Sequence, residues 1–166
     1  RKNIIEKLSY EKVYKQGFNI NTPINLDLQK IATNSLRNGL IDYDKRKGWR
    51  GPLINLKNYN ENWSTDLEKY KLEKSINWDL AIIKKIDKFF TTIETEDNKE
   101  GTILYNNISW TKKEFDELFN LGDLVYVKKI DDSKYSLMQV PKINGGIVVM
   151  DPFTGRVLAL SGGFSF

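Results

Sequence analysis

The most sharply patterned stretch of the chain, and the one that most limits its fold, lies near its end. Residues 145–150 read GGIVVM, a continuous apolar run typical of a strand buried on both faces. Residues 151–155 read DPFTG, in which Asp bonds the backbone ahead, Pro fixes its own φ and Gly takes a left-handed conformation. Residues 156–160 return as an apolar strand, which Gly162 and Gly163 end. The pattern predicts an antiparallel hairpin that belongs to a larger core.

Short apolar or alternating segments, separated by polar turns, fill the middle of the chain. They predict five strands, at residues 80–86, 89–95, 101–105, 124–130 and 135–140. Between the third and fourth strands, Thr111 and Glu114 match the capping-box pattern and predict a short helix that Gly122 ends. Residues 58–77 predict a long polar loop with a short helix at 66–70. Five short strands with a helix before the fourth resemble an OB-type barrel, whose closure removes the edges of the sheet.

The first 45 residues predict helices and one strand. Residues 4–14 have a weak helical pattern, and residues 18–22 alternate like a half-buried strand that stops at Pro23. From Leu26 onward, apolar residues recur every three or four positions and predict an amphipathic helix capped by Asn25. We therefore predict a mainly β chain with flanking helices (α+β): a five-stranded OB-like barrel plus a terminal β-hairpin and an N-terminal strand-helix segment.

Two absences limit the chemistry, because the chain has no cysteine and no histidine. They exclude cysteine nucleophiles, Ser-His triads, the usual zinc sites and disulfide scaffolds. The formal net charge is +4, but lysine dominates and is interleaved with acidic residues, so we expect a solvated surface rather than a phosphate-reading patch. No apolar run is long enough to span a bilayer. The chain opens without Met, so we expect a piece of a longer protein.

Two stretches match Ser-x-x-Lys, the nucleophile motif of one class of acyl-transfer enzymes: Ser9 with Lys12, and Ser109 with Lys112. That chemistry also needs a Ser-x-Asn and a Lys-Thr-Gly, and the sequence contains no Lys-Thr-Gly. Lysine is so common here that chance matches are expected. We interpret both stretches as structural.

Carboxylate pairs and aromatic residues offer two further candidates. We assign Asp131 with Asp132, and Asp42 with Asp44, to turns or an exposed helix face rather than to paired acid–base chemistry. Aromatic and lysine side chains of the predicted barrel could line a stacking groove for single-stranded nucleic acid. They are Trp78, Phe89, Phe90, Tyr105, Trp110 and Tyr126, with Lys84, Lys85, Lys112 and Lys128. Core packing and ordinary surface lysines explain them better, so we predict no catalytic, cofactor-binding or metal-binding residues.

Several motifs, taken in their order, resemble class A penicillin-binding proteins of the 1A type. Residues 139–141 (QVP), the hairpin and residues 162–166 (GGFSF) resemble the beginning of the transpeptidase domain. Residues 17–29 resemble the strand and helix that precede it. Residues 43–52 (YDKRKGWRGP) resemble the junction at which 1A members begin an inserted OB-like domain.

The resemblance implies three parts. Residues 1–45 are a linker and the N-terminal piece of the transpeptidase domain, residues 46–140 are the OB-like insert, and residues 141–166 are the truncated first hairpin of the transpeptidase domain. In the family, the reactive Ser-x-x-Lys lies shortly after the equivalent of Phe166. Without the rest of its sheet, the hairpin is expected to leave apolar surface and unpaired edges. We expect it to pair with residues 18–22, to swap between chains or to be poorly ordered.

The resemblance further implies a non-catalytic accessory or regulatory fragment of a bifunctional peptidoglycan synthase, with glycosyltransferase and DD-transpeptidase domains. Such a protein is anchored at the periplasmic side of the bacterial inner membrane. The expected partners are peptidoglycan or a regulatory envelope protein, and the rest of the transpeptidase domain; we expect no nucleic acid and no cofactor. Two alternatives remain: an OB-fold module that binds single-stranded nucleic acid, and a purely structural spacer without a ligand.

Overall fold

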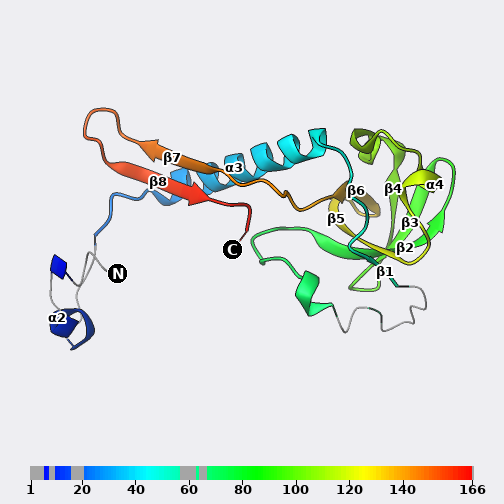
Figure 1. Ribbon diagram of the computed structural model, residues 1–166, viewed down its shortest axis with the longest axis horizontal. Helices are drawn as coiled ribbons and strands as arrows, with labels where there is room; N and C mark the ends of the chain where they lie inside the picture. Colours follow the sequence, from blue (N-terminus) through cyan, green and yellow to red (C-terminus); the bar gives the residue numbers. More distant parts are fainter. Residues whose placement is uncertain (1–5, 8–9, 16–20, 57–62, 64–66, 166) are drawn as a thin grey trace.

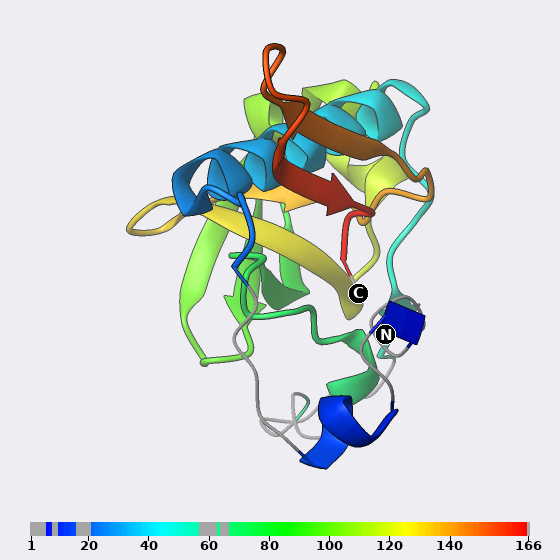
Figure 2. The ribbon, with the colours of Figure 1, turned by 90° about the vertical axis from the view of Figure 1, so that its left-hand side faces the viewer.

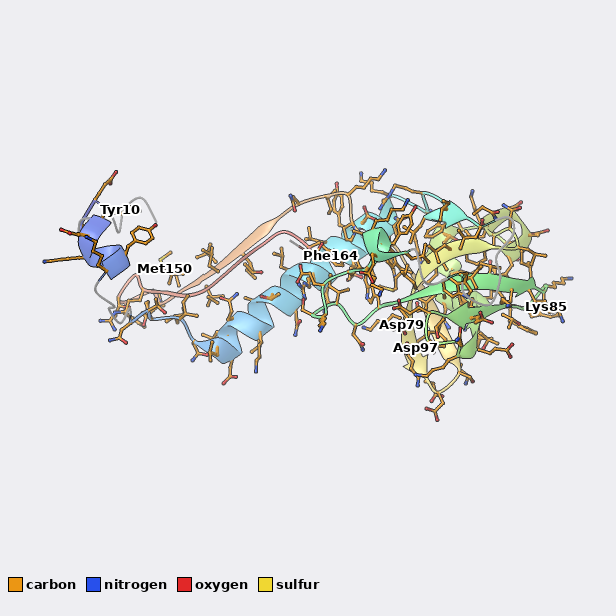
Figure 3. All side chains as sticks on the ribbon, turned by 90° about the horizontal axis from the view of Figure 1, so that it is seen from below. Tyr10, Asp79, Lys85, Asp97, Met150 and Phe164 are labelled. Carbon is orange, nitrogen blue, oxygen red and sulfur yellow. The ribbon has the colours of Figure 1, made fainter. Side chains whose placement is uncertain are left out.

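The computed structural model describes residues 6–7, 10–15, 21–56, 63 and 67–165. It is elongated: a β-barrel forms one end, and a long helix with a hairpin beside it reaches away from the barrel (Figure 1). Seen from below, Lys85 marks the far end of the barrel and Met150 lies far from it, toward the opposite end of the molecule (Figure 3). The barrel corresponds to the short strands predicted in the middle of the chain. The helix and the hairpin correspond to the patterns predicted before and after those strands.

The long helix is α3 (Leu26–Arg46), which follows a short helix, α2 (Tyr10–Lys15). Asn25 caps α3 as predicted: its side-chain oxygen accepts from the amides of Asp27 and Leu28, each at 3.0 Å. This bond satisfies amide groups that have no partner inside the helix. The predicted start of the helix is therefore confirmed.

Five strands close into the barrel. They are β2 (Asp79–Ile86), β3 (Phe90–Thr95), β4 (Glu100–Leu104), β5 (Asp123–Asp131) and β6 (Lys134–Met138). β2, β3 and β4 pair antiparallel in sequence, β4 pairs parallel with β6, and β5 pairs antiparallel with both β6 and β2. The short strand β1 (Ile54–Asn55) adds to β5. This is the strand order of an OB barrel, and the predicted fold class is confirmed.

Between β4 and β5 the predicted capping box is wrong. The elements there are η2 (Tyr105–Asn107), η3 (Ser109–Thr111) and α4 (Phe115–Leu118). Lys112 takes a left-handed conformation with φ of 58°, which separates Thr111 from the helix; the hydroxyl of Thr111 instead accepts from the amide of Lys113 at 3.3 Å. Glu114 precedes α4 without capping it. Gly122 has the predicted positive φ, 82°, but it lies in the turn before β5, beyond the end of α4.

Alternate strand residues fill the barrel. The buried interior cluster consists of Ala81, Ile83, Ile93, Ile103, Ile108, Phe115, Leu118, Phe119, Val125, Val127, Tyr135 and Leu137. Gly101 makes room for the Tyr135 ring, since a Cβ at this position would lie 2.3 Å from Tyr135 Cε2. The outer faces of β2 and β5 are also buried, because Trp63 and Leu67 pack there against Ile82 and Leu124.

The hairpin consists of β7 (Gly146–Met150) and β8 (Val157–Gly162), packed beside α3. The outer edge of β8 bonds to α3 and its cap. The Asn25 amide donates to the Leu158 carbonyl at 2.8 Å, and the Gln29 carboxamide both accepts from the Leu160 amide (3.0 Å) and donates to its carbonyl (2.9 Å). Gln29 thus takes the place of a neighbouring strand. Val148 and Leu160 stay 54% and 61% exposed, as the predicted apolar surface requires. Two other expectations are wrong: the outer edge of β8 is paired, by Asn25 and Gln29, and β7 is exposed at alternate residues instead of buried on both faces.

The predicted pairing of the hairpin with residues 18–22 falls mostly on residues 18–20, which lie outside the described residues. Asn21 and Thr22, which are described, are not in a strand. Exchange of the hairpin between chains stays a prediction.

Candidate functional site

The chain passes between α3 and the barrel twice, through an incoming segment (residues 47–53) and an outgoing segment (residues 139–142). Asp44, in the last turn of α3, lies between them and is only 2% exposed. Its two carboxylate oxygens accept from Arg50 Nη1 at 2.9 and 2.8 Å. Arg50 Nη2 donates to the Val140 carbonyl at 2.7 Å, so one guanidinium joins the helix to both segments.

Gln139 completes this arrangement. Its Nε2 donates to Asp44 Oδ2 at 2.8 Å and to the Gly48 carbonyl at 3.1 Å, while its Oε1 accepts from the Arg50 amide at 2.9 Å. The Lys142 amide donates to Asp44 Oδ1 at 3.1 Å. We call Asp44, Arg50, Gln139 and Lys142 the junction. A buried carboxylate is tolerated only where it is paired and hydrogen-bonded, so these bonds fix the crossing segments to each other and to α3.

A second set of bonds, which we call the clasp, centres on Arg37 of α3. Its Nε donates to the Phe164 carbonyl at 3.0 Å, and its Nη2 donates to Glu73 Oε2 at 3.2 Å and Ser75 Oγ at 2.9 Å. The ring of Phe164 lies 5.3 Å from that of Trp78, just ahead of β2. The barrel is therefore attached to α3 at two separate places.

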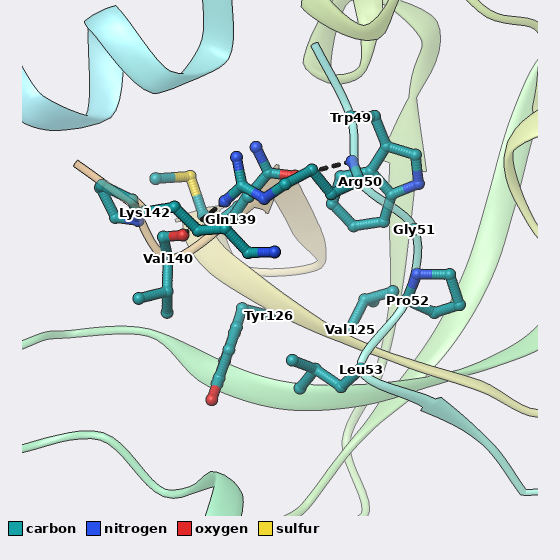
Figure 4. A pocket seen from close by; sticks show the side chains of 12 residues that line it. Trp49, Arg50, Gly51, Pro52, Leu53, Val125, Tyr126, Gln139, Val140 and Lys142 are labelled. Atoms are coloured by element: carbon teal, nitrogen blue, oxygen red, sulfur yellow. Dashed lines mark hydrogen bonds between the residues drawn. The ribbon is translucent and has the colours of Figure 1, made fainter. Parts of the chain in front are cut away.

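A pocket of about 340 Å³ opens at the junction (Figure 4). Apolar side chains form much of it, among them Pro52, Leu53 and Val140, and Arg50 and Gln139 supply its polar groups. None of its lining residues is a serine, threonine or carboxylate. Within the part of the chain that the structure describes, no cluster of Asp and Glu could hold a metal ion. The guanidinium of Arg50 and the carboxamide of Gln139 can bind and position a ligand in this pocket.

The predicted site residues do not come together. Ser9 lies outside the described residues, and Ser109 begins η3, where its hydroxyl donates to the Asn106 carbonyl at 3.1 Å. Lys112 is exposed in its left-handed turn. Asp131 and Asp132 are exposed at the turn between β5 and β6.

The assignment of Asp42 and Asp44 to turns or an exposed helix face needs a correction. Asp42 is exposed, as expected, but Asp44 is buried and paired with Arg50. The helical period alone placed Asp44 on the solvent side, because the segments that cover it come from outside the helix. The available signal was the spacing of Asp44 and Arg50 within residues 43–52, the stretch that resembles the start of the OB-like insert.

The aromatic set of the nucleic-acid alternative is dispersed. Trp110 packs against Trp49 at 5.9 Å, Tyr126 is 7% exposed, and Trp78 contacts Phe164. Phe89 is exposed in the turn between β2 and β3. Trp78 and Tyr126 lie 6.2 Å apart and line one hollow, but Trp110 and Phe89 do not line it, so the aromatic set forms no continuous stacking groove. An oligonucleotide titration remains the test of this alternative.

The outer face of the barrel carries a partly buried acidic group, Glu94. Glu94 of β3 accepts from Trp63 Nε1 at 2.8 Å and pairs with Lys84 Nζ at 3.0 Å. The hydrogen bond from Trp63 lowers the pKa of Glu94, and Lys84 lowers it further. Glu94 is therefore ionised at neutral pH, and Lys84 is engaged with it.

Among the described residues, no helix combines the length and the apolar character needed to cross a membrane.

Comparison with known proteins identifies the family. A family model described as "Penicillin-binding protein OB-like domain" matches residues 49–143. Penicillin-binding protein 1A of Rickettsia felis is 34% identical over 171 residues, covering 100% of this chain and 21% of that protein. Penicillin-binding protein 1A of Pseudomonas aeruginosa is 28% identical, over 93% of this chain and 20% of its own length. The chain thus spans about a fifth of the length of these relatives.

A solved structure shows the same fold. The crystal structure of penicillin-binding protein 1A from Haemophilus influenzae matches 99% of this chain and 25% of its own, with a TM-score of 0.76 and 24% identity. The resemblance seen in the sequence motifs is confirmed. Since the family model covers more than half of its residues, this chain belongs to the penicillin-binding protein OB-like domain family.

Proposed function

We propose that this chain is the barrel-bearing part of a bifunctional peptidoglycan synthase that works on the periplasmic side of the bacterial inner membrane. In this proposal, residues 46–140 are a non-catalytic accessory domain. Residues 1–45 are a linker and the N-terminal piece of the transpeptidase domain, and residues 141–166 are its first hairpin. Glycan polymerisation and stem-peptide cross-linking take place elsewhere in the full-length protein. The relatives named penicillin-binding protein 1A, which match along the whole chain, support this assignment.

The junction is the observation that carries the accessory role. A flexible spacer needs only exposed, polar connections between its domains. Here a buried carboxylate, an arginine and a glutamine hold both connections in place. These bonds would fix the orientation of the barrel relative to the transpeptidase part. The barrel then presents its outer surface to peptidoglycan or to a regulatory envelope protein in a fixed direction.

The full-length protein provides the test. Residues 51–139 are deleted, or Asp44 is changed to Ala, and glycan polymerisation and cross-linking are measured separately. We expect both changes to reduce cross-linking of polymeric substrate, while the rate of acylation by a soluble β-lactam stays within about twofold, because the reactive serine lies elsewhere. Asp116→Ala, an exposed substitution on α4, is the control.

Two results would contradict the proposal. Unchanged activities and unchanged partner binding after the deletion leave only the spacer function. A stable adduct between the 166-residue chain and a labelled β-lactam, at Ser109 or any other serine, would show that the chain has an active site of its own.

A further inference from the structure

A larger hollow, of about 770 Å³, lies between α3 and the barrel; we call it the interdomain cleft. Residues Asn34, Asn38, Asp42 and Lys45 line its helical wall, and their spacing of three and four places them on one face of α3. The facing wall comes from the end of β5, from β6 and from the loop before β2. In Figure 2, α3 passes above β5, with the red C-terminal end of β8 beside them. The cleft is separate from the junction pocket.

Three carboxamides face this cleft, those of Asn34, Asn38 and Asn77. All three residues are exposed, and their side chains have no hydrogen-bond partner among the described residues. Asparagine is also one of the weaker helix formers, so Asn34 and Asn38 reduce the stability of α3 relative to alanine. Neither helix stability nor an internal bond explains these side chains. Each offers a donor and an acceptor to a ligand.

Apolar groups and three lysines, Lys45, Lys128 and Lys129, also line the cleft. The indole of Trp78 is half-buried beside Phe164. Lys45 and Lys128 both line the cleft, and Lys45 Nζ lies 3.8 Å from Met138 Sδ. Burial lowers the pKa of Lys45, and the nearby charge of Lys128 lowers it further, whereas Asp42 acts in the opposite direction. An anion between the two lysines would offset the repulsion between their charges.

The other cation of the helical wall is not available, because Arg37 is fully used in the clasp. Phosphate readers depend on such forked guanidinium groups, and single-strand binders on several stacking rings. A peptide held by strand addition is read by pockets for alternate side chains. The cleft instead presents carboxamides around one indole, with cations nearby.

We propose that the interdomain cleft binds a short oligosaccharide that carries carboxylates. The carboxamides of Asn34, Asn38 and Asn77 bond its hydroxyl and amide groups, and Trp78 packs against the C–H face of a sugar ring. Lys45 and Lys128 bind its carboxylates. The volume suits a ligand of a few rings. This binding site lies on α3, and it does not depend on whether the junction holds the barrel in a fixed orientation.

The test is a titration of the isotope-labelled 166-residue chain with hyaluronan tetrasaccharide, which carries both carboxylates and acetamido groups. Side-chain amide signals of the three asparagines and the Trp78 indole signal are followed by NMR. Saturable shifts are expected, with a Kd below about 10 mM. Chitotetraose, which is neutral, should bind at least about threefold more weakly, because it cannot pair with the lysines.

Matched variants locate the site. Asn34→Ala and Lys128→Gln should each weaken binding about fivefold, the loss expected for one hydrogen bond. Ser35→Ala, on the same helix but outside the cleft, and Lys113→Gln, on the exposed turn before α4, should change it less than about twofold. Absence of saturable shifts, or an equal loss in the controls, would overturn the proposal. So would stronger shifts of the same signals by penta-glutamate, which would assign the cleft to an acidic peptide.

Discussion

Replacing Asp44 by Asn tests whether the junction holds the barrel in place. The substitution keeps the shape of the side chain but removes its charge and turns one acceptor oxygen into a donor group. In the structure both oxygens are used: Oδ1 accepts from Arg50 and the Lys142 amide, and Oδ2 from Arg50 and Gln139. One orientation of the new amide therefore opposes the Lys142 amide and the other opposes Gln139 Nε2.

The size of the effect follows from these contacts. Loss of a charge-assisted bond costs about 1.5–3 kcal/mol, at the lower end here because the Arg50 side chain is 28% exposed. A buried donor left without an acceptor adds about 1 kcal/mol or more. We therefore expect the free energy of unfolding to fall by about 3 kcal/mol. For a chain of this length this corresponds to a decrease in Tm of about 6–12 °C.

Urea denaturation followed by tryptophan fluorescence measures this difference, and hydrogen exchange shows where it arises. Exchange should accelerate first at the crossing segments, residues 47–53 and 139–142, rather than inside the barrel. Asp42→Asn is the matched control, an exposed carboxylate on the same helix that should change the free energy of unfolding by less than about 0.5 kcal/mol. If Asp44→Asn and Asp42→Asn give the same small change, the junction does not stabilise the fold and the reasoning is refuted.

Three further predictions concern the fold. Gly101→Ala should destabilise the chain by about 1–3 kcal/mol, because the new Cβ meets the buried Tyr135 ring. Gly39→Ala, which has open space around it on α3, should instead stabilise the chain by about 0.5–1 kcal/mol. Equal effects of the two substitutions in thermal melts would contradict this. Asn25→Ala should cost about 1 kcal/mol through loss of the helix cap, measured by the same melts, and an unchanged Tm would refute it. Burial raises the pKa of Asp79, and a neighbouring carboxylate raises it further. The folded state therefore holds this proton more tightly than the unfolded chain, so the free energy of unfolding falls as pH rises through the carboxyl range. Asp79→Asn should therefore stabilise at pH 7 and lose this gain in acid, and a gain that persists below the ordinary carboxyl pKa would contradict the assignment.

Most of the secondary structure could be predicted from local pattern. The strands β2 to β6 lie within a few residues of their predicted positions, since alternation of side chains is a property of each strand by itself. Asn25 was identified as a cap for the same reason, because it bonds amides only two and three residues away. The capping-box prediction was wrong because tertiary packing overrode the local pattern. Thr111 is buried in the barrel, and the left-handed Lys112 separates it from α4.

The candidate sites could not be predicted in the same way. The sequence placed Asp44 on an exposed face of an amphipathic helix, because the period of a helix says nothing about which distant segments cover it. Asp44 meets Gln139 across 95 positions, and Arg37 meets Phe164 across 127. The order of the short motifs was enough to indicate the family, because each motif consists of residues that are neighbours in the sequence.

By itself, the sequence determined the strands, the long helix, the hairpin and the kinship with penicillin-binding proteins, since each rests on periodicity, turn chemistry or short motifs within a few residues. Only the tertiary structure decided which charges are buried and paired, and which asparagines line a cleft. The physical reason is that burial and pairing depend on groups distant along the chain, which meet only when the barrel closes and α3 packs against it.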